Sequence, residues 1–246
     1  MSEPPIQTAG AYHYDSSPEG INDTRRSAEV IVPLVLRLIR AQSVVDFGCG
    51  LGDWLRVFSE RGCSEVVGLD GPWVPADHLQ IPKDAFRVMQ LAESSPSLGR
   101  RFDLACSLEV AEHVPPDAGE RLVKALTEAA DVVLFSAAIP HQGGYMHVNE
   151  QYQSHWIDQF GKLGYAAHDL IRPQIWMDER CCWWYQQNIL LFATPAAAER
   201  NGLATRPFIA DMVHPVMNER ANDPRNWSGR MMLKMLGAKL MKKLGL

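Results

Sequence analysis

Short apolar runs alternate with helical patterns along most of the chain. The runs lack the strict polar alternation of half-exposed strands, which is typical of strands that are buried on both faces of a parallel sheet. The helical segments between them include 53–61 and 118–130, and the second opens with Asp117 and Glu120 at capping-box spacing. The apolar runs lie at 43–47, 65–69, 86–90, 102–108 and 132–136. This order predicts a doubly wound α/β fold around a mostly parallel sheet.

Two long β-prone runs close the core of the chain, at 165–176 and 183–193. The loop between them is too short for the crossover helix that two parallel strands need. We therefore expect the two runs to pair as an antiparallel hairpin. Together with the five earlier runs, they predict a seven-stranded, mostly parallel sheet that ends in an antiparallel hairpin.

The N-terminal segment, residues 1–22, is polar and rich in turn-forming residues. We expect a mobile arm there that closes over the functional site, which is a common role of such segments. Asn22 and Asp23 can cap the first helix of the core. The main domain then covers residues 23–195.

The C-terminal extension, residues 196–246, ends in a basic segment. Residues 228–246 carry five Lys and Arg residues and no acidic residue. Within them, one stripe of a helix would carry Leu233, Leu236, Leu240 and Leu244. Such a basic amphipathic helix can pack against the domain or against a second subunit of a homodimer, and it can also contact an anionic membrane surface. We favour packing.

Composition and charge narrow the class of protein. Hydrophobic residues make up 46% and charged residues 22% of the 246 residues, which are ordinary values for a globular protein. The net charge of −5 makes nucleic acid an unlikely partner, because nucleic-acid binders carry a basic surface. The N-terminus does not resemble a signal peptide, and the five cysteines show no zinc-binding spacing. These features favour a cytoplasmic protein with reduced thiols.

The sequence VVDFGCGLG is typical of a strand that runs through a glycine turn into a helix. Gly48, Gly50 and Gly52 allow a tight turn and let a ligand approach the backbone closely. Eighteen residues after Gly52, Asp70 ends the next strand, where a carboxylate can accept hydrogen bonds from both hydroxyls of a ribose. The combination predicts a nucleoside-binding site.

The segments VVDFGCGLG, GLD and FDLACSLEVAEHV, with the terminal hairpin, resemble class I S-adenosylmethionine-dependent methyltransferases over roughly residues 25–195. The resemblance implies a Rossmann-like methyltransferase fold, S-adenosylmethionine as cofactor, and a methyltransferase domain over 23–195. It places two glycines near the methionine part of the cofactor, Asp46 near its amino group, and Asp70 on its ribose. Asp46 can alternatively serve as a cap on the glycine turn. The implied cofactor-binding residues are Asp46, Gly48, Gly50, Asp70, Leu91, Ala92 and Leu108.

Two carboxylates and an imidazole follow the fourth strand, at Glu109, Glu112 and His113. Their spacing places them on one face of a helical turn, at the edge of the sheet where ligands bind in such folds. Converging carboxylates are costly unless a cation lies between them, which suggests a divalent metal. Without a metal, the same side chains serve the structure or contact the substrate.

The loop after the fifth strand, IPHQGGYMHVNEQ, adds His141 and His147 at the same edge. ExxEH with a later histidine resembles the metal site of small-RNA terminal 2′-O-methyltransferases, and ExxEH also resembles that of ubiquinone-pathway catechol O-methyltransferases. The resemblance implies a metal, with magnesium, manganese, zinc and iron as candidates, that grips two neighbouring oxygens of the substrate. The implied metal ligands are Glu109, Glu112, His113 and His147, and the candidates for a catalytic base are His141 and His113.

The loop motif HVNEQ and the later WWYxQN are similar to methyltransferases of bacterial polysaccharide and glycoside biosynthesis. We therefore expect O-methylation of a sugar or glycoside hydroxyl, whose pKa a bound metal can lower. Aromatic residues around the hairpin either pack in the core or form a stacking wall for the acceptor. The alternatives are a phenolic or catechol O-methyltransferase, an RNA-end methyltransferase, which the charge disfavours, and a non-catalytic cofactor-binding subunit.

Overall fold

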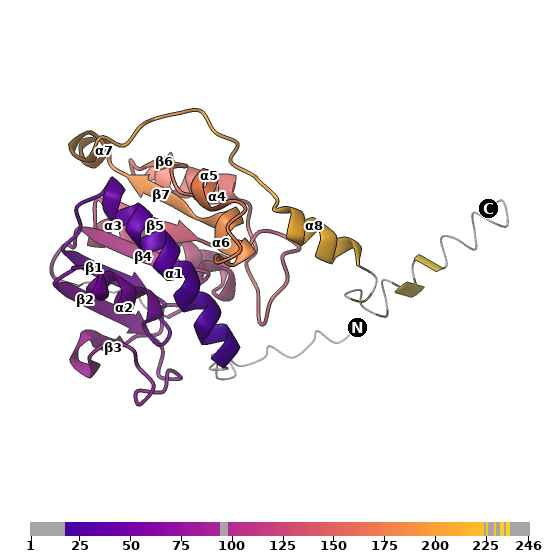
Figure 1. The fold of residues 1–246 in the computed structure, drawn as a ribbon, viewed down its shortest axis with the longest axis horizontal. Coiled ribbons are helices and arrows are strands. Elements are labelled where there is room, and N and C mark those ends of the chain that lie inside the picture. The colour runs from indigo at the N-terminus through magenta and orange to yellow at the C-terminus, as the bar shows by residue number, and fades with distance from the viewer. Residues whose placement is uncertain are drawn as a thin grey trace.

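A single seven-stranded sheet organises the residues that the computed structural model describes, which are 18–93, 98–223, 225, 229, 232, 233, 235 and 236. Its strand order is β3-β2-β1-β4-β5-β7-β6 (Figure 1). The strands are β1 Ser43–Phe47, β2 Glu65–Asp70, β3 Phe86–Val88, β4 Leu104–Leu108, β5 Val132–Ser136, β6 Ala166–His168 and β7 Leu190–Ala193. Strands β1 to β5 run parallel, and β7 pairs antiparallel with both β5 and β6. The doubly wound fold and its antiparallel end are therefore confirmed.

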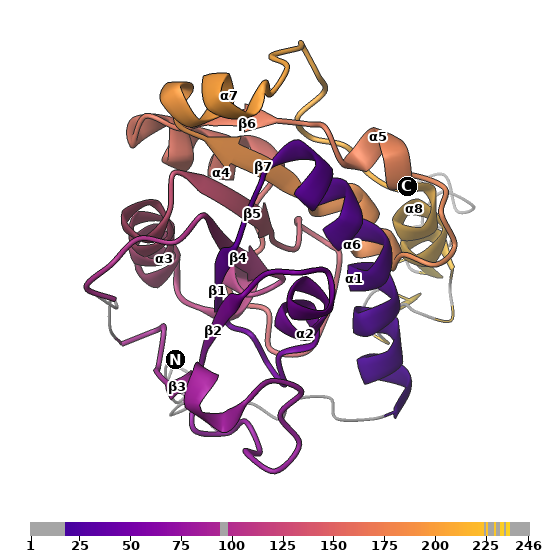
Figure 2. The ribbon, with the colours of Figure 1, turned by 60° about the vertical axis from the view of Figure 1, so that its left-hand side comes forward.

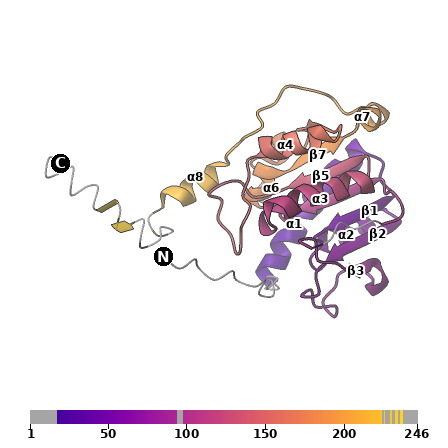
Figure 3. The ribbon, with the colours of Figure 1, turned by 180° about the vertical axis from the view of Figure 1, so that it is seen from behind.

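Helices cover both faces of this sheet. They are α1 Pro18–Leu38, α2 Asp53–Glu60, α3 Pro116–Ala129, α4 Gln153–Lys162, α5 Arg172–Ile175, α6 Trp183–Asn188, α7 Pro195–Asn201 and α8 Pro215–Asn222, with 3-10 turns η1 Lys83–Ala85 and η2 Ala111–His113. Helices α1 and α2 lie on one face, and α3 and α4 lie on the other, as Figures 2 and 3 show. No helix within the described residues combines the length and the apolar character that crossing a membrane requires.

Alternating strand residues supply the two halves of the core. Val44 of β1 packs in the half covered by α1 and α2, whereas its neighbour Val45 packs in the half covered by α3 and α4. Leu134 and Phe135 of β5 divide in the same way. Because both faces of a central strand are covered, its sequence is continuously apolar and shows no polar alternation.

The strand order reverses between β1 and β4, which lie side by side at the centre of the sheet. The loops that leave the carboxyl ends of these two strands diverge, one towards α2 and the other towards α3. Ligands of open α/β sheets bind in the crevice that forms at such a point. The fold therefore brings the glycine loop after β1 and the acidic segment after β4 to opposite sides of one crevice.

The predicted terminal hairpin is correct in its pairing but wrong in its extent. Its two strands, β6 and β7, are only three and four residues long. Helices α5 and α6 occupy most of the remaining residues of the two β-prone runs. Pro173 in the first turn of α5 fits a helix start and cannot donate to a sheet ladder. In α6, Tyr185 packs edge-on against Trp54 with ring centroids 5.2 Å apart, so tertiary contact overrides the local β propensity.

Two predicted helix starts are also wrong. Helix α1 begins at Pro18, so Asn22 and Asp23 lie inside it and do not cap it. Helix α3 begins at Pro116 without a capping side chain, because consecutive prolines preset its first turn, and the predicted capping box does not form. Asp117 instead pairs with Arg121 one turn later.

The predicted terminal segments are only partly described. Residues 1–17 of the predicted arm, and most of the predicted basic helix over 228–246, lie outside the described residues. Of the predicted leucine stripe, Leu233 and Leu236 are described, and both are exposed. All five cysteines are free, as expected for reduced thiols.

A buried arginine joins the last part of the chain to the core. The guanidinium of Arg172 is fully buried and forms a bidentate pair with Asp169, with N–O distances of 3.0 and 2.9 Å. It also donates to the carbonyl oxygens of Gln187, Ile209 and Ala210. The end of α6 is thereby held against the segment that leads to α8.

We expect Arg172→Met to destabilise the protein by about 3–5 kcal/mol, because it leaves the Asp169 carboxylate buried without its partner. Urea unfolding followed by circular dichroism would measure the loss. Arg180→Met is the matched control, because Arg180 pairs with Asp178 at the surface, and its free energy of unfolding should stay near wild type. Equal stabilities for the two variants would contradict this role of Arg172.

Candidate functional site

The glycine loop after β1 requires glycine for two separate reasons. Gly48, Gly50 and Gly52 have φ angles of 83°, 54° and 89°, a region that other residues rarely adopt. A Cβ atom on Gly48 would also lie 2.4 Å from a methyl carbon of Val110, which approaches from the other side of the crevice. The backbone N–H of Gly48 donates to the carbonyl oxygen of Leu69 at 2.7 Å, which fixes the loop beside the end of β2.

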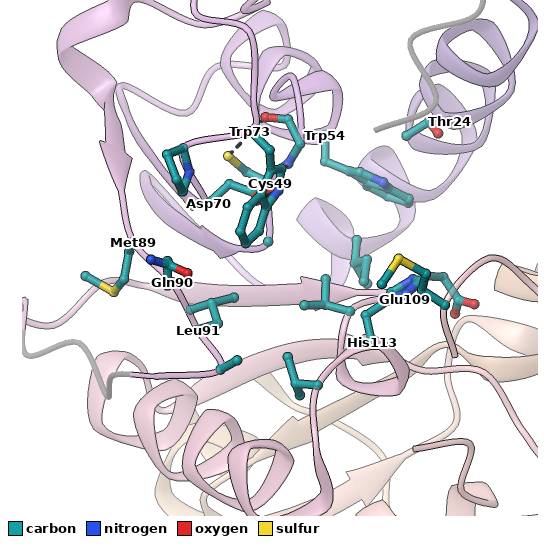
Figure 4. A pocket seen from close by; sticks show the side chains of 18 of the residues that line it. Thr24, Cys49, Trp54, Asp70, Trp73, Met89, Gln90, Leu91, Glu109 and His113 are labelled. Carbon is teal, nitrogen blue, oxygen red and sulfur yellow. Dashed lines mark hydrogen bonds between the residues drawn. The ribbon is translucent and has the colours of Figure 1, made fainter. Parts of the chain in front are cut away.

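A cavity of about 630 Å³ lies between this loop and the segments that follow β2, β3 and β4 (Figure 4). Asp70 and Trp73 lie towards one end, and Glu109 and His113 lie towards the other. The predicted residues that line it are Gly48, Gly50, Asp70, Leu91, Ala92, Leu108, Glu109 and His113. Sequence reasoning missed Thr24, Trp54, Trp73, Met89 and Gln90, which line it as well. Tyr185 also lines it and belongs to the aromatic residues that were predicted either to pack in the core or to form a stacking wall.

Asp70 connects β2 to the glycine loop. Its Oδ2 accepts the N–H of Gly50 at 2.7 Å, and its Oδ1 accepts the N–H of Gly71 at 2.6 Å and the indole N–H of Trp73 at 3.0 Å. Burial raises the pKa of Asp70, and these hydrogen bonds oppose the shift. Since a carboxylate has about four acceptor positions, roughly one remains for a ligand hydroxyl. A ligand that donates two hydroxyls would have to displace the indole of Trp73.

Asp46 lies on β1 below the loop and does not line the cavity. It is 2% exposed, and its Oδ1 has no hydrogen-bond partner among the described residues. Burial, together with the charge of Asp70, raises the pKa of Asp46 to about 7. Such a buried carboxylate costs stability when it ionises and would be stabilised by a nearby cation.

The segment after β4 does not form the predicted helical face. Glu109 has a φ of 56°, and the 3-10 turn η2 follows it, so the i, i+3, i+4 geometry of an α-helix is lost. Glu109 instead accepts hydrogen bonds from the side-chain amides of Asn188 and Gln142. Burial raises the pKa of Glu109, and these amides oppose the shift.

Glu112 and His113 nevertheless converge with His147. One potential metal-ligand atom from each of the three lies within 4.8 Å of the other two. Backbone bonds cause this convergence, because the carbonyl oxygen of Glu112 accepts the N–H groups of Val148 and Asn149 at 2.8 and 3.1 Å. The loop that carries His147 is thereby fastened to η2.

The donor set of this cluster fits a divalent cation. Glu112 is buried, one of its carboxylate oxygens lacks a partner among the described residues, and burial with the charge of Glu109 raises its pKa well above the usual range. Burial and the neighbouring His147 lower the pKa of His113 to about 4, so His113 is neutral at pH 7, the form that binds metals. One carboxylate and two imidazoles suit manganese, iron or zinc better than magnesium.

The remaining predicted residue, His141, lies apart from this cluster. Its side chain is exposed and does not line the cavity, and its φ is 71°. Its backbone N–H donates to Glu150, whose carboxylate also contacts His147. Sequence reasoning missed Glu150 as well as the amides of Gln142 and Asn188.

We expect Asp46→Asn to stabilise the cofactor-free protein at pH 8. The pKa of Asp46 is about 4 in the unfolded chain and about 7 in the folded protein. Between these two pH values the unfolded state loses its proton first, so the Asp46 carboxyl lowers the free energy of unfolding more and more as the pH rises. The gain should therefore be absent below pH 4 and should reach up to about 4 kcal/mol above pH 7, at about 1.4 kcal/mol for each pKa unit. Urea unfolding across this pH range would measure it.

Asp103→Asn is the control of opposite sign. Partial burial acts to raise the pKa of Asp103, but hydrogen bonds from Gln42 and Ser43 dominate and lower it. Its stabilising contribution is present above pH 4 and is lost as the pH falls, so this variant should be weaker than wild type at pH 8. A pH-independent effect of Asp46→Asn would contradict the shifted pKa of Asp46.

Comparisons with known proteins agree with this architecture. A family model described as a methyltransferase domain matches residues 21–188. A search of curated protein sequences finds no match to this chain.

Solved structures show the same fold at low sequence identity. The magnesium protoporphyrin IX methyltransferase of Synechocystis PCC 6803, with bound S-adenosylmethionine, is 18% identical, with 70% of this chain and 80% of that chain covered and a TM-score of 0.51. DesVI of Streptomyces venezuelae is 11% identical, with 70% of this chain and 94% of that chain covered and a TM-score of 0.54. The methyltransferase domain of bacterial CtHen1-C is 18% identical, with 69% of this chain and 97% of that chain covered and a TM-score of 0.52.

The family match begins in α1 and ends in α6, so it includes the glycine loop, Asp70 and both sides of the cavity. It covers well over half of the chain. The chain therefore belongs to the methyltransferase domain family and is a class I S-adenosylmethionine-dependent methyltransferase.

Proposed function

We propose that this methyltransferase methylates a hydroxyl of a sugar or glycoside, with a divalent metal that holds two neighbouring hydroxyls of the acceptor. The observation that carries the proposal is the convergence of Glu112 and His147 on His113, which lines the cavity. His113 belongs both to this cluster and to the lining of the cavity, so an acceptor held by the cluster would face the cofactor site.

The chain's own residues bind and orient the cofactor in this proposal. Asp70 accepts a ribose hydroxyl, and the glycine loop lets the methionine part approach the backbone. The buried Asp46 carboxylate, one of whose oxygens has no hydrogen-bond partner among the described residues, provides negative charge below the loop for the cofactor's ammonium group. Leu91 and Ala92 lie on the cavity wall next to Met89 and Gln90 and would flank the adenine.

The acceptor hydroxyl must lose its proton as it takes the methyl group. Glu112, His113 and His147 would hold the metal, which supplies Lewis acidity that lowers the pKa of a bound hydroxyl. Glu109 lies beside Glu112 and adds negative charge to the same place. His113 lines the cavity, but it can act as the base only when it does not bind the metal, because a neutral imidazole has a single lone pair. Beside a bound metal the base candidate is His141, which would have to approach with a movement of its loop.

The surroundings of His147 favour a ring-shaped acceptor. Tyr145 and Val148 lie on the same loop with 62% and 60% of their surface exposed, and Tyr152 is also exposed. Aromatic side chains stack on the apolar faces of sugar rings, which suits a glycoside. The same exposed side chains would also pack against an aromatic ring. A catechol is therefore the second candidate, because it too presents two neighbouring oxygens.

We expect Asp70→Ala to weaken S-adenosylmethionine binding by about 10- to 100-fold. At least one charge-assisted hydrogen bond, about 1.5–3 kcal/mol, would be lost. Isothermal titration calorimetry would measure the affinity. Asp77→Ala removes an exposed carboxylate that pairs with Lys83 and should bind like wild type. Unchanged affinity in Asp70→Ala would remove Asp70 from the cofactor site.

We expect a chelator to abolish methyl transfer and added manganese or magnesium to restore it. The assay would follow transfer from radiolabelled S-adenosylmethionine to a panel of glycosides and catechols. Glu112→Ala should remove the response to metal while cofactor affinity stays near wild type, because Glu112 does not line the cavity.

Glu120→Ala is the matched control for this experiment, because Glu120 is an exposed carboxylate on α3. It should keep both the activity and the response to metal. Full activity in excess chelator, with no metal in the purified protein, would defeat the metal mechanism and leave a histidine as general base on a single hydroxyl.

A further inference from the structure

The carboxylate of Glu150 is fixed by the backbone of its own loop. One oxygen accepts the N–H of His141 at 2.8 Å, and the other accepts the N–H of Gly143 at 3.1 Å. The second oxygen also contacts Nδ1 of His147 at 2.9 Å. Three contacts to donors on one short loop prevent the carboxylate from turning away, so its position relative to the imidazole is set by the fold.

This contact decides the tautomer of His147. An ionised carboxylate accepts hydrogen bonds and cannot donate one. The hydrogen between the two groups must therefore be on Nδ1 of His147, which leaves the lone pair of the neutral ring on Nε2. Among the two ring nitrogens, Nε2 is then the one that can bind a metal or accept a proton.

The surroundings of the imidazole hold it in this orientation. The His147 ring packs edge-on against the ring of His113, with centroids 4.8 Å apart. On another side it packs against Gly144, where an added Cβ would lie 2.2 Å from Nε2 and 2.3 Å from Cε1. Glycine at this position is therefore a spatial requirement of the His147 side chain, and no positive φ contributes to it.

We propose that Glu150 is a positioning residue, which presents Nε2 of His147 to the metal and acceptor, and that Gly144 leaves the space for that orientation. The inference rests on the proposed function for its chemical purpose. Carboxylates that accept the second ring N–H of a ligating histidine typically contribute 10- to 100-fold in metal affinity. Glu150 itself lies one contact away from the metal cluster and is not among its ligands.

The test compares Glu150→Gln with Glu150→Asp by two measurements. A glutamine amide can donate to Nδ1 as well as accept from it, so Glu150→Gln should populate the second tautomer, in which Nε2 carries the hydrogen. Nitrogen-15 NMR of histidine-labelled protein, with His147 assigned from a His147→Ala variant, reports the tautomer directly. Titration with Mn²⁺ should show a loss of about 10- to 100-fold in affinity for Glu150→Gln. Glu150→Asp should retain the Nδ1–H tautomer and recover part of the affinity.

Gly144→Ala provides an independent variant, because it leaves Glu150 unchanged and displaces the imidazole. It should lower Mn²⁺ affinity to a similar extent, while Gly161→Ala, which meets no atom within 4 Å, should not. Cofactor affinity should stay near wild type in all four variants. If wild type binds no Mn²⁺, the proposed metal function fails, and the tautomer measurement still tests the role of Glu150. The Nδ1–H tautomer together with wild-type Mn²⁺ affinity in Glu150→Gln would overturn the inference.

Discussion

Burial of negative charge at the carboxyl edge of the sheet is the constraint around which this structure is arranged. Asp46 lies inside the end of β1, Asp70 ends β2, and Glu109 and Glu112 follow β4. Burial raises the pKa of each of these four carboxyl groups. Carboxylates in such surroundings oppose folding unless donors or cations offset their charge. The four carboxylates differ in how many hydrogen-bond donors surround them. This difference indicates which of them are available to a ligand.

Two of the four carboxylates are largely satisfied by the protein itself. Asp70 accepts two backbone N–H groups and an indole N–H, and Glu109 accepts the amides of Asn188 and Gln142. Asp46 and Glu112 each keep a buried oxygen without a partner among the described residues. The two incompletely satisfied groups lie on opposite sides of the crevice, one below the glycine loop and one beside the histidines. A cationic cofactor group and a divalent metal would satisfy them separately.

The sequence predicted those features that depend on local pattern. Continuous apolar runs predicted the parallel strands, and the spacing of the glycine loop to Asp70 predicted one side of the cavity. Features that depend on tertiary contact were missed. Helices α5 and α6 replaced predicted strands because Arg172 and Tyr185 are buried by distant segments. Trp73 and Glu150 act through contacts that no spacing rule contains, although the glutamate three residues after His147 was a visible signal.

The four predicted metal ligands differ in how far other side chains already occupy their ligand atoms. Glu109 is already held by amides from two other segments, and the potential metal ligands that converge within the described residues are Glu112, His113 and His147. Binding a metal through Glu109 would require breaking hydrogen bonds that are buried, at a cost of about 1–3 kcal/mol for each group left unpaired. Binding through Glu112 would instead satisfy an oxygen that has no hydrogen-bond partner in the described part of the chain. In the proposed metal site, Glu109 would therefore add negative charge beside the cation without coordinating it, and Glu112 would be the carboxylate ligand.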